Sequence, residues 1–172
     1  MPYSANLIAY AFVKKGIDER TFVTQMNLQN LVYFAQGLHL ALHNKPLIEE
    51  EFQAWKFGPV VPSIYQSYML YGSAPITGTQ WLFFIPEKNL NKLDTEAEET
   101  MNFTWKSLII YNAAKLFNWT HQKGSPWEKV FVDGTSDQYI PNQYIQEYFK
   151  RFVVETIANV RKVNIENIFS EI

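Results

Sequence analysis

The sequence predicts an all-α dominated fold: a compact single domain of about six to seven helices, with at most a short strand or hairpin near residues 47–57 and 81–85. Three observations lead to this prediction. Apolar residues recur at three- and four-residue spacing along much of the chain, which is the period of one helix face. Capping and helix-ending residues flank these stretches. With 172 residues, 47% hydrophobic and 19% charged, the chain can bury roughly 70% of its unfolded surface in one core.

The first two helices are predicted from their caps and their apolar faces. Ser4 can accept hydrogen bonds from the amides that follow it, and Gly16 suits the left-handed position that ends a helix. Thr24 can cap a second helix over residues 25–42. Its core-facing stripe consists of Leu28, Leu31, Val32, Ala35, Leu38 and Leu42. Gly37 lies inside this helix at a cost of roughly 1 kcal/mol relative to alanine, so we expect another helix to approach closely there.

The extended segments are predicted in the middle of the chain. Residues 47–57 permit a short strand, and Gly58-Pro59 is predicted to form a turn, because proline fixes its own φ and disfavours the helical region for the preceding residue. Pro62 can begin a third helix that ends at Gly72. The apolar run 81–85 fits a short strand or an extended arm.

Four further helices are predicted in the second half of the chain. The first covers residues 96–111 behind the capping-box spacing of Thr95 and Glu98, and the second covers residues 113–120. The third begins at Ser125-Pro126, and the fourth covers residues 141–163. We expect residues 164–172 to fray, and we expect residues 1–172 to form one domain.

Composition and charge exclude several functional classes. The net charge of −2 gives no global positive field that would draw the chain to nucleic acid. The absence of cysteine removes disulfides, thiolate nucleophiles and cysteine-type zinc sites. A signal peptide has a basic region before its apolar segment, and this chain has no basic region there. No apolar run reaches the ~18–20 residues of a membrane span. We therefore expect a cytoplasmic protein with no membrane partner and no direct nucleic-acid partner.

The histidines provide the strongest hypothesis for chemistry. His39 and His43 are one helical turn apart, and His121 could supply a third metal ligand for a hydrolase. However, the zinc-protease motif needs glutamate directly after the first histidine, and this chain has Leu40 there. Packing of His39 beside the core, with His43 near the negative end of its helix, is the favoured interpretation. The sequence has neither a nucleophile elbow nor a phosphate-binding loop, so it predicts a non-enzyme without metal or cofactor.

Several blocks of sequence carry a family resemblance. They are residues 28–42 (LQNLVYFAQGLHLAL), 46–65 (PLIEEEFQAWKFGPVVPSIY) and 120–127 (THQKGSPW), followed by Ile140 and Tyr148-Phe149. In this order they resemble the signatures of the Panacea-domain family, which contains Soc-type antitoxins and phage-associated proteins. The resemblance covers about residues 4–150. One position departs from the pattern, because Asn30 stands where the family usually carries lysine.

The resemblance implies an α-helical domain that neutralises a cognate toxin by direct protein contact, the toxin being encoded by an adjacent gene in a bacterial or prophage module. The alternative is a proteolytic adaptor, which would also bind a cellular protease, or a phage host-takeover factor without a cognate toxin. The candidate partner-binding or signature residues are Gln29, Gln36, Trp55, Lys56, Tyr65, His121 and Trp127, with Gly58 and Pro59 as a structural turn.

Each of these residues has a structural and a functional interpretation. Packing is favoured for Trp55 and Trp127, and a fully buried Trp55 would make Trp55→Ala cost roughly 3–5 kcal/mol. The polar candidates either satisfy buried partners or line a partner-binding face. Both interpretations remain open for Gln29, Gln36, Lys56, Tyr65 and His121.

Overall fold

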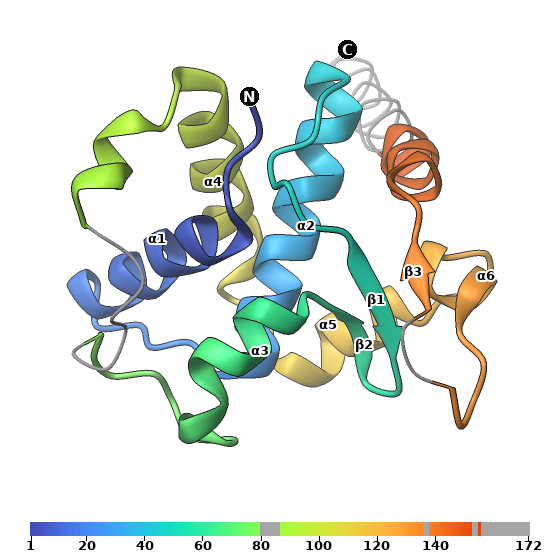
Figure 1. The fold of residues 1–172 in the computed structure, drawn as a ribbon, viewed down its shortest axis with the longest axis horizontal. Coiled ribbons are helices and arrows are strands. Elements are labelled where there is room, and N and C mark those ends of the chain that lie inside the picture. The colour runs from blue at the N-terminus through green and yellow to red at the C-terminus, as the bar shows by residue number, and fades with distance from the viewer. Residues whose placement is uncertain (80–86, 136–137, 153–154, 156–172) are drawn as a thin grey trace, which may run out of the picture.

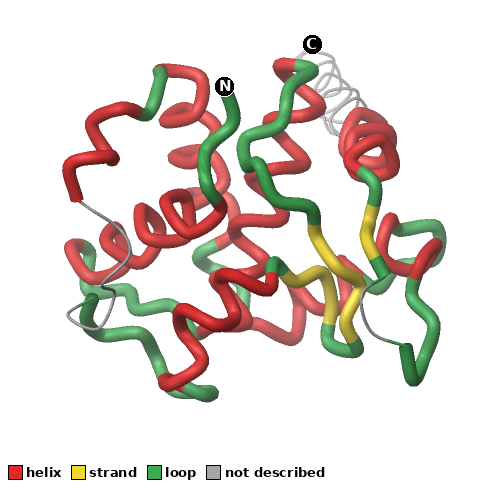
Figure 2. The backbone as a smooth tube through the Cα atoms, in the orientation of Figure 1, coloured by secondary structure: helices red, strands yellow, loops and turns green. Residues whose placement is uncertain are grey.

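Helix α2 (Gln25–His43) is the central element of the fold, and the other elements are arranged around it (Figure 1). The computed structural model describes residues 1–79, 87–135, 138–152 and 155. The other elements are α1 (Ala5–Asp18), β1 (Phe52–Trp55), β2 (Gly58–Val60), α3 (Pro62–Tyr68), the 3₁₀ helices η1 (Met69–Tyr71) and η2 (Glu87–Lys92), α4 (Thr95–Leu108), α5 (Ala113–Thr120), α6 (Pro126–Val130), β3 (Tyr139–Ile140) and helical residues 142–152. Helices dominate the backbone trace in Figure 2, which confirms the predicted fold class.

Helix α2 is buried on all sides over residues 28–40. The Thr24 hydroxyl accepts a hydrogen bond from the Asn27 amide at 3.3 Å, and Asn44 ends the helix at a φ of 54°. Helices α1 and α4, the β-hairpin and α5 all contact it. A side chain at Gly37 would overlap the Phe149 ring of helical residues 142–152. The predicted close approach at this glycine is therefore confirmed.

A small antiparallel sheet lies beside α2, and its strand order is β2-β1-β3. Strand β1 pairs with β2, where Trp55 faces Gly58, and with β3, where Phe52 faces Ile140. A short strand or hairpin was predicted near residues 47–57, and the structure has a hairpin whose second strand begins at Gly58, just beyond that range. The second predicted strand, at residues 81–85, lies outside the described residues.

The turn of the hairpin is not at Gly58-Pro59, so that prediction is wrong. Lys56 and Phe57 make the turn, and Gly58-Pro59 begin strand β2. Gly58 has a φ of 122°, a conformation that glycine reaches at little cost because it has no Cβ. The pair therefore carries the chain out of the turn and into the ladder.

Helix α1 also differs from the prediction at its end. It continues past Gly16 to Asp18, and the chain reverses at Arg20, which has a φ of 53°. Gly16 is required for a different reason, since a Cβ there would lie 2.8 Å from the Thr21 carbonyl oxygen.

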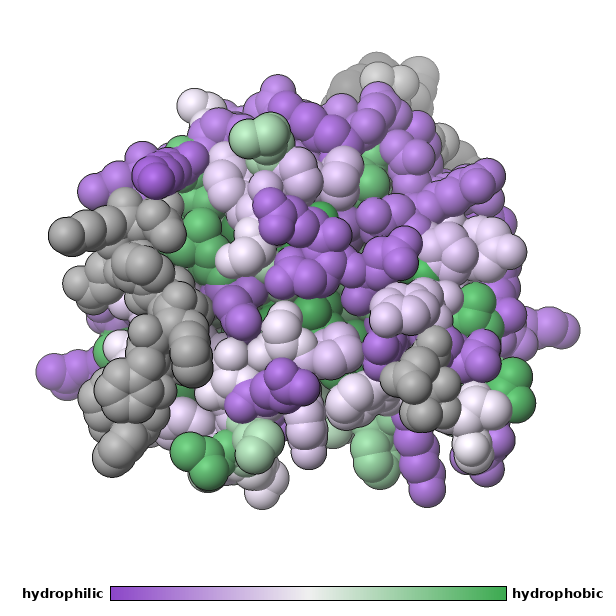
Figure 3. All heavy atoms as spheres, viewed as in Figure 1, coloured by the Kyte–Doolittle hydropathy of each residue, from purple (hydrophilic) through white to green (hydrophobic). Residues whose placement is uncertain are grey.

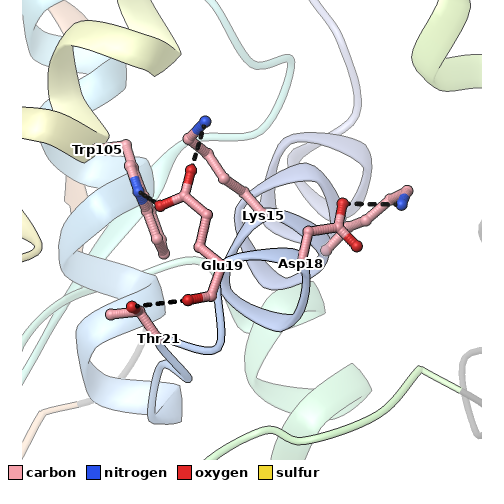
Figure 4. Close-up of polar contacts among 6 residues, drawn as sticks. Lys15, Asp18, Glu19, Thr21 and Trp105 are labelled. Atoms are coloured by element: carbon pink, nitrogen blue, oxygen red, sulfur yellow. Dashed lines mark hydrogen bonds and ion pairs between the residues drawn. The ribbon is translucent and has the colours of Figure 1, made fainter.

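An acid at the end of α1 ties this helix to α4 (Figure 4). The Trp105 indole donates a hydrogen bond of 2.8 Å to the Glu19 carboxylate, which also pairs with Lys15 at 3.1 Å. These two donors, the indole first, hold the pKa of Glu19 below its usual value.

At the other end of α4, Asp94 caps the helix by accepting from the Ala97 amide at 2.9 Å. The predicted cap, Thr95, is instead the first helical residue.

Candidate functional site

Two buried glutamines of α2 hold the chain on both sides of the hairpin. The Gln36 side-chain oxygen accepts from the Leu47 and Ile48 amides at 2.8 and 3.1 Å, ahead of β1. The Gln29 side chain accepts from the Val61 amide at 2.9 Å and donates to the Val61 carbonyl at 3.2 Å, directly after β2. The side-chain amide of each glutamine thus supplies hydrogen bonds that a neighbouring strand would otherwise supply to this buried backbone. Both glutamines satisfy buried partners, which is one of the two interpretations of the sequence.

His121, at the end of α5, and Trp127 of α6 pack against the hairpin. The Trp127 indole donates a hydrogen bond of 2.7 Å to the Trp55 carbonyl. The His121 ring lies between the rings of Phe117 and Trp127, at 3.7 and 3.9 Å between centroids. A Cβ on Gly58 would lie 3.5 Å from this imidazole. Packing is therefore the role of Trp127, which is 8% exposed, and His121 belongs to the same support.

The tip of the hairpin is exposed and carries the remaining signature residues. Phe57 is 63% exposed and Lys56 is exposed beside it. Trp55 is half-buried, with its ring edge-on to the exposed Tyr65 of α3 at 5.2 Å. The Trp55 indole donates to Gln53 at 2.8 Å, within the same strand. The structure therefore brings the side chains of Trp55, Lys56 and Tyr65 together at the surface.

These side chains border a pocket of about 700 Å³, called the hairpin groove below. Its walls come from the start of α2, the hairpin, α3 and the start of α5, and its lining includes Met26, Trp55, Phe57, Pro59 and Tyr65. Most of this lining is apolar. In Figure 3, apolar atoms also reach the surface in several places along the lower edge of the molecule, below a largely polar upper part.

Met26 and Phe57 line the groove but are not among the site residues predicted from the sequence. Met26 is 40% exposed at the start of α2, and its position gave no signal because it precedes the core-facing residues of that helix, which begin at Leu28. Phe57 could have been found from its place between Lys56 and Gly58, since an aromatic residue in a turn is difficult to bury. The three-dimensional arrangement was needed to bring both residues to one groove.

The structure does not bring the three histidines of the metal hypothesis together. The rings of His39 and His43 lie 4.6 Å apart between centroids at a tilt of 48°, and His39 Nδ1 lies 3.1 Å from the Thr100 hydroxyl. His121 belongs instead to the aromatic stack beneath the hairpin. Within the described ranges no three His, Cys, Asp or Glu side chains are grouped to hold a metal ion.

His39 predicts a pH dependence of stability. Burial, followed by the nearby His43 and Lys45, lowers the pKa of His39 to about 4, from about 6.5 in an unfolded chain. Between these values the unfolded state binds a proton that the folded state excludes. The free energy of unfolding should therefore fall by about 2–3 kcal/mol as the pH decreases from 6.5 to 4. Urea unfolding at several pH values measures this effect, and His39→Gln should remove most of it; an unchanged pH profile in that variant would contradict the assignment.

Trp55→Ala should cost about 1–2 kcal/mol of stability, because the ring is half-buried and loses only part of a full burial term. Thermal unfolding measures this loss, with Trp127→Ala as the buried comparison that should cost more. A loss of 3 kcal/mol or more for Trp55→Ala would indicate that the ring is a core residue.

Comparison with known proteins identifies the family to which the chain belongs. The model of the family described as antitoxin SocA-like, Panacea domain, matches residues 28–128. The chain belongs to this family. The matched residues run from α2 to α6 and include the hairpin, both glutamines and the His121–Trp127 support.

A relative of this Panacea-domain chain is the protein named Antitoxin SocA from Caulobacter vibrioides (strain NA1000 / CB15N). It is 28% identical over 134 residues, which are 73% of this chain and 69% of the relative. No solved structure matches the chain. None of the helices in the described part of the chain has the length and apolar composition needed to cross a membrane.

Proposed function

We propose that this Panacea-domain chain is an antitoxin that neutralises a cognate protein toxin by direct contact in the cytoplasm, and that it acts by binding and not by catalysis. Membership of the SocA-like family supports the antitoxin role. The observation that carries the contact mechanism is the hairpin groove, an apolar depression on a rigid support.

The groove has the properties of a protein-binding surface. Large apolar side chains are exposed at its border, with Phe57 at 63%, Tyr65 at 41% and Met26 at 40%. Aromatic residues and methionine are enriched in the buried centres of protein interfaces, and an exposed apolar patch with a polar surround commonly marks an interaction site. Water contact with these side chains is unfavourable, so a partner that covers them gains binding free energy.

The support beneath the groove limits the cost of binding. Gln29 fixes the end of the hairpin to α2, and Trp127 fixes its β1 strand to α6. A preorganised surface loses little conformational freedom when a partner binds. The hairpin tip can therefore present Phe57 in a constant position.

Co-expression tests this proposal. The gene adjacent to the one that encodes this chain should be toxic when expressed alone, and the wild-type chain should restore growth and co-purify with the toxin. Phe57→Ser should abolish or strongly weaken both effects. Phe103→Ser is the matched control, because Phe103 is 60% exposed on α4 and does not line the groove.

Two outcomes would contradict the contact mechanism. A harmless neighbour that does not bind the chain would remove the antitoxin role. Growth rescue that requires a cellular protease, with no inhibition of the purified toxin by the purified chain, would instead indicate delivery of the toxin to that protease.

A further inference from the structure

The charged and unpaired polar groups that line the hairpin groove are positive charges or hydrogen-bond donors. Lys56 is the one charged side chain among its described lining residues, and aspartate and glutamate are absent from them. Lys56 makes no ion pair with another described residue, and its ammonium group lies 5.8 Å from the Phe57 ring centroid. The whole chain is slightly acidic, at −2, so the groove differs in sign from the molecule around it.

Two helices begin at the groove and add to this positive character. Thr24, Gln25 and Met26 belong to the N-terminal turn of the 19-residue helix α2, and Ala113 is the first residue of the eight-residue helix α5. Neither helix has an acidic residue in its first turn. The N-terminus of a helix carries a partial positive charge and free amide donors, which favour a negative group.

Asn30 provides an independent observation. It lines the groove, its side chain is 4% exposed, and its Nδ2 atom is buried without a hydrogen-bond partner. A buried donor without an acceptor costs about 1–3 kcal/mol. Because Nδ2 has almost no accessible surface, a partner's oxygen acceptor recovers that free energy when the Asn30 amide rotates and turns Nδ2 toward the groove.

We propose that the hairpin groove recognises a segment of the partner protein in which a large apolar side chain stands next to the carboxylate of an aspartate or glutamate. The apolar side chain packs between Phe57, Tyr65 and Met26. The Asn30 side-chain amide rotates so that the carboxylate accepts from Nδ2, and the carboxylate lies in the positive field of Lys56 and the α2 N-terminus. This inference rests on the proposed function, and names the chemistry by which the groove would select a toxin.

A peptide selection tests the recognition chemistry directly. The probe is a phage-displayed library of random dodecapeptides, fused through their C-termini so that no free C-terminal carboxylate is present, selected against the full chain. Enriched sequences should carry Phe, Trp, Leu or Met beside Asp or Glu. Basic peptides, or peptides that bind a Phe57→Ser variant equally well, would overturn the proposal.

Affinities of an amidated synthetic copy of an enriched peptide then assign the contacts. Lys56→Glu should weaken binding about 10-fold or more, and the loss should shrink at high salt because the charges are exposed. Lys106→Glu is the matched control, because it makes the same charge change at an exposed position of α4 outside the groove.

Asn30 is tested with a double-mutant cycle. Asn30→Leu should weaken the acidic peptide about 10-fold, and should not weaken the same peptide with its acid replaced by alanine. Equal effects on both peptides would mean that Asn30 does not meet the carboxylate. Thermal unfolding of each variant separates a lost contact from a lost fold.

The two proposals can fail separately. A toxin that is neutralised as well by Lys56→Glu and Asn30→Leu as by the wild type would leave the antitoxin role standing and overturn this inference. A selected acidic peptide that binds the groove, in the absence of any neutralised toxin, would overturn the proposed function alone. Self-association of the chain that an acidic peptide does not displace would assign the groove to a second copy and overturn the inference.

Discussion

Replacing Gln36 by leucine should lower the free energy of unfolding by about 3–5 kcal/mol. The side-chain oxygen of Gln36 accepts from two backbone amides, those of Leu47 and Ile48, and its side-chain nitrogen donates to Asn142 at 3.0 Å. Gln36, Leu47 and Ile48 are all fully buried. Leucine has a similar volume but no acceptor, so both amides would be buried unpaired at about 1–3 kcal/mol each.

Urea unfolding of Gln36→Leu measures this loss, and Gln66→Leu is the control with the same chemical change on the exposed side of α3. The control should change stability by less than about 0.5 kcal/mol. If Gln36→Leu also left the free energy of unfolding nearly unchanged, the Leu47 and Ile48 amides would have to find other acceptors. Gln36 would then not be the residue that holds the chain ahead of β1 to α2.

Replacing Gly37 by alanine should cost about 2–3 kcal/mol, although alanine is the better helix former by roughly 1 kcal/mol. The added Cβ would overlap the Phe149 ring. That ring cannot move aside freely, because it is 2% exposed and packs against Tyr33 and Phe34 at 5.7 and 5.5 Å between centroids. Overpacking of this kind typically costs 1–3 kcal/mol.

A double mutant provides the decisive measurement for Gly37. Phe149→Leu alone removes ring volume and should destabilise the protein, while Gly37→Ala combined with Phe149→Leu should be more stable than the sum of the two single effects predicts. Additive effects would mean that the Cβ clashes with some other group. Either outcome is read from chemical denaturation curves of the four proteins.

Local sequence signals predicted most of the helix starts because each signal acts over a few residues. Ser4 and Thr24 cap their helices with their side chains, as predicted, whereas Asp94 and not Thr95 caps α4. A short strand or hairpin near residues 47–57 was also predicted. The turn at Gly58-Pro59 was wrong because the local preference of proline for turns does not specify which residue pairs with Trp55; the pairing across the strands decides it.

The roles of the signature residues could not be read from the sequence. Gln29 and Lys56 are both polar residues in apolar surroundings, yet Gln29 is 5% exposed and bonded to Val61 while Lys56 is exposed at the hairpin tip. Burial depends on which distant segments pack over a residue, and α2 meets segments more than a hundred positions away, such as Asn142.

The sequence by itself determined the helical fold class, several of the helix caps and the membership of the Panacea-domain family, since these depend on local periodicity and on residue order. Only the tertiary structure decided that Gln29, Gln36 and Trp127 support the hairpin, and that Met26, Phe57 and Asn30 share one groove. The physical reason is that the groove is made by residues from separate parts of the chain: α2, the hairpin, α3, the Gly72-Ser73 segment and α5. Their relative placement is fixed by long-range packing, which no local pattern encodes.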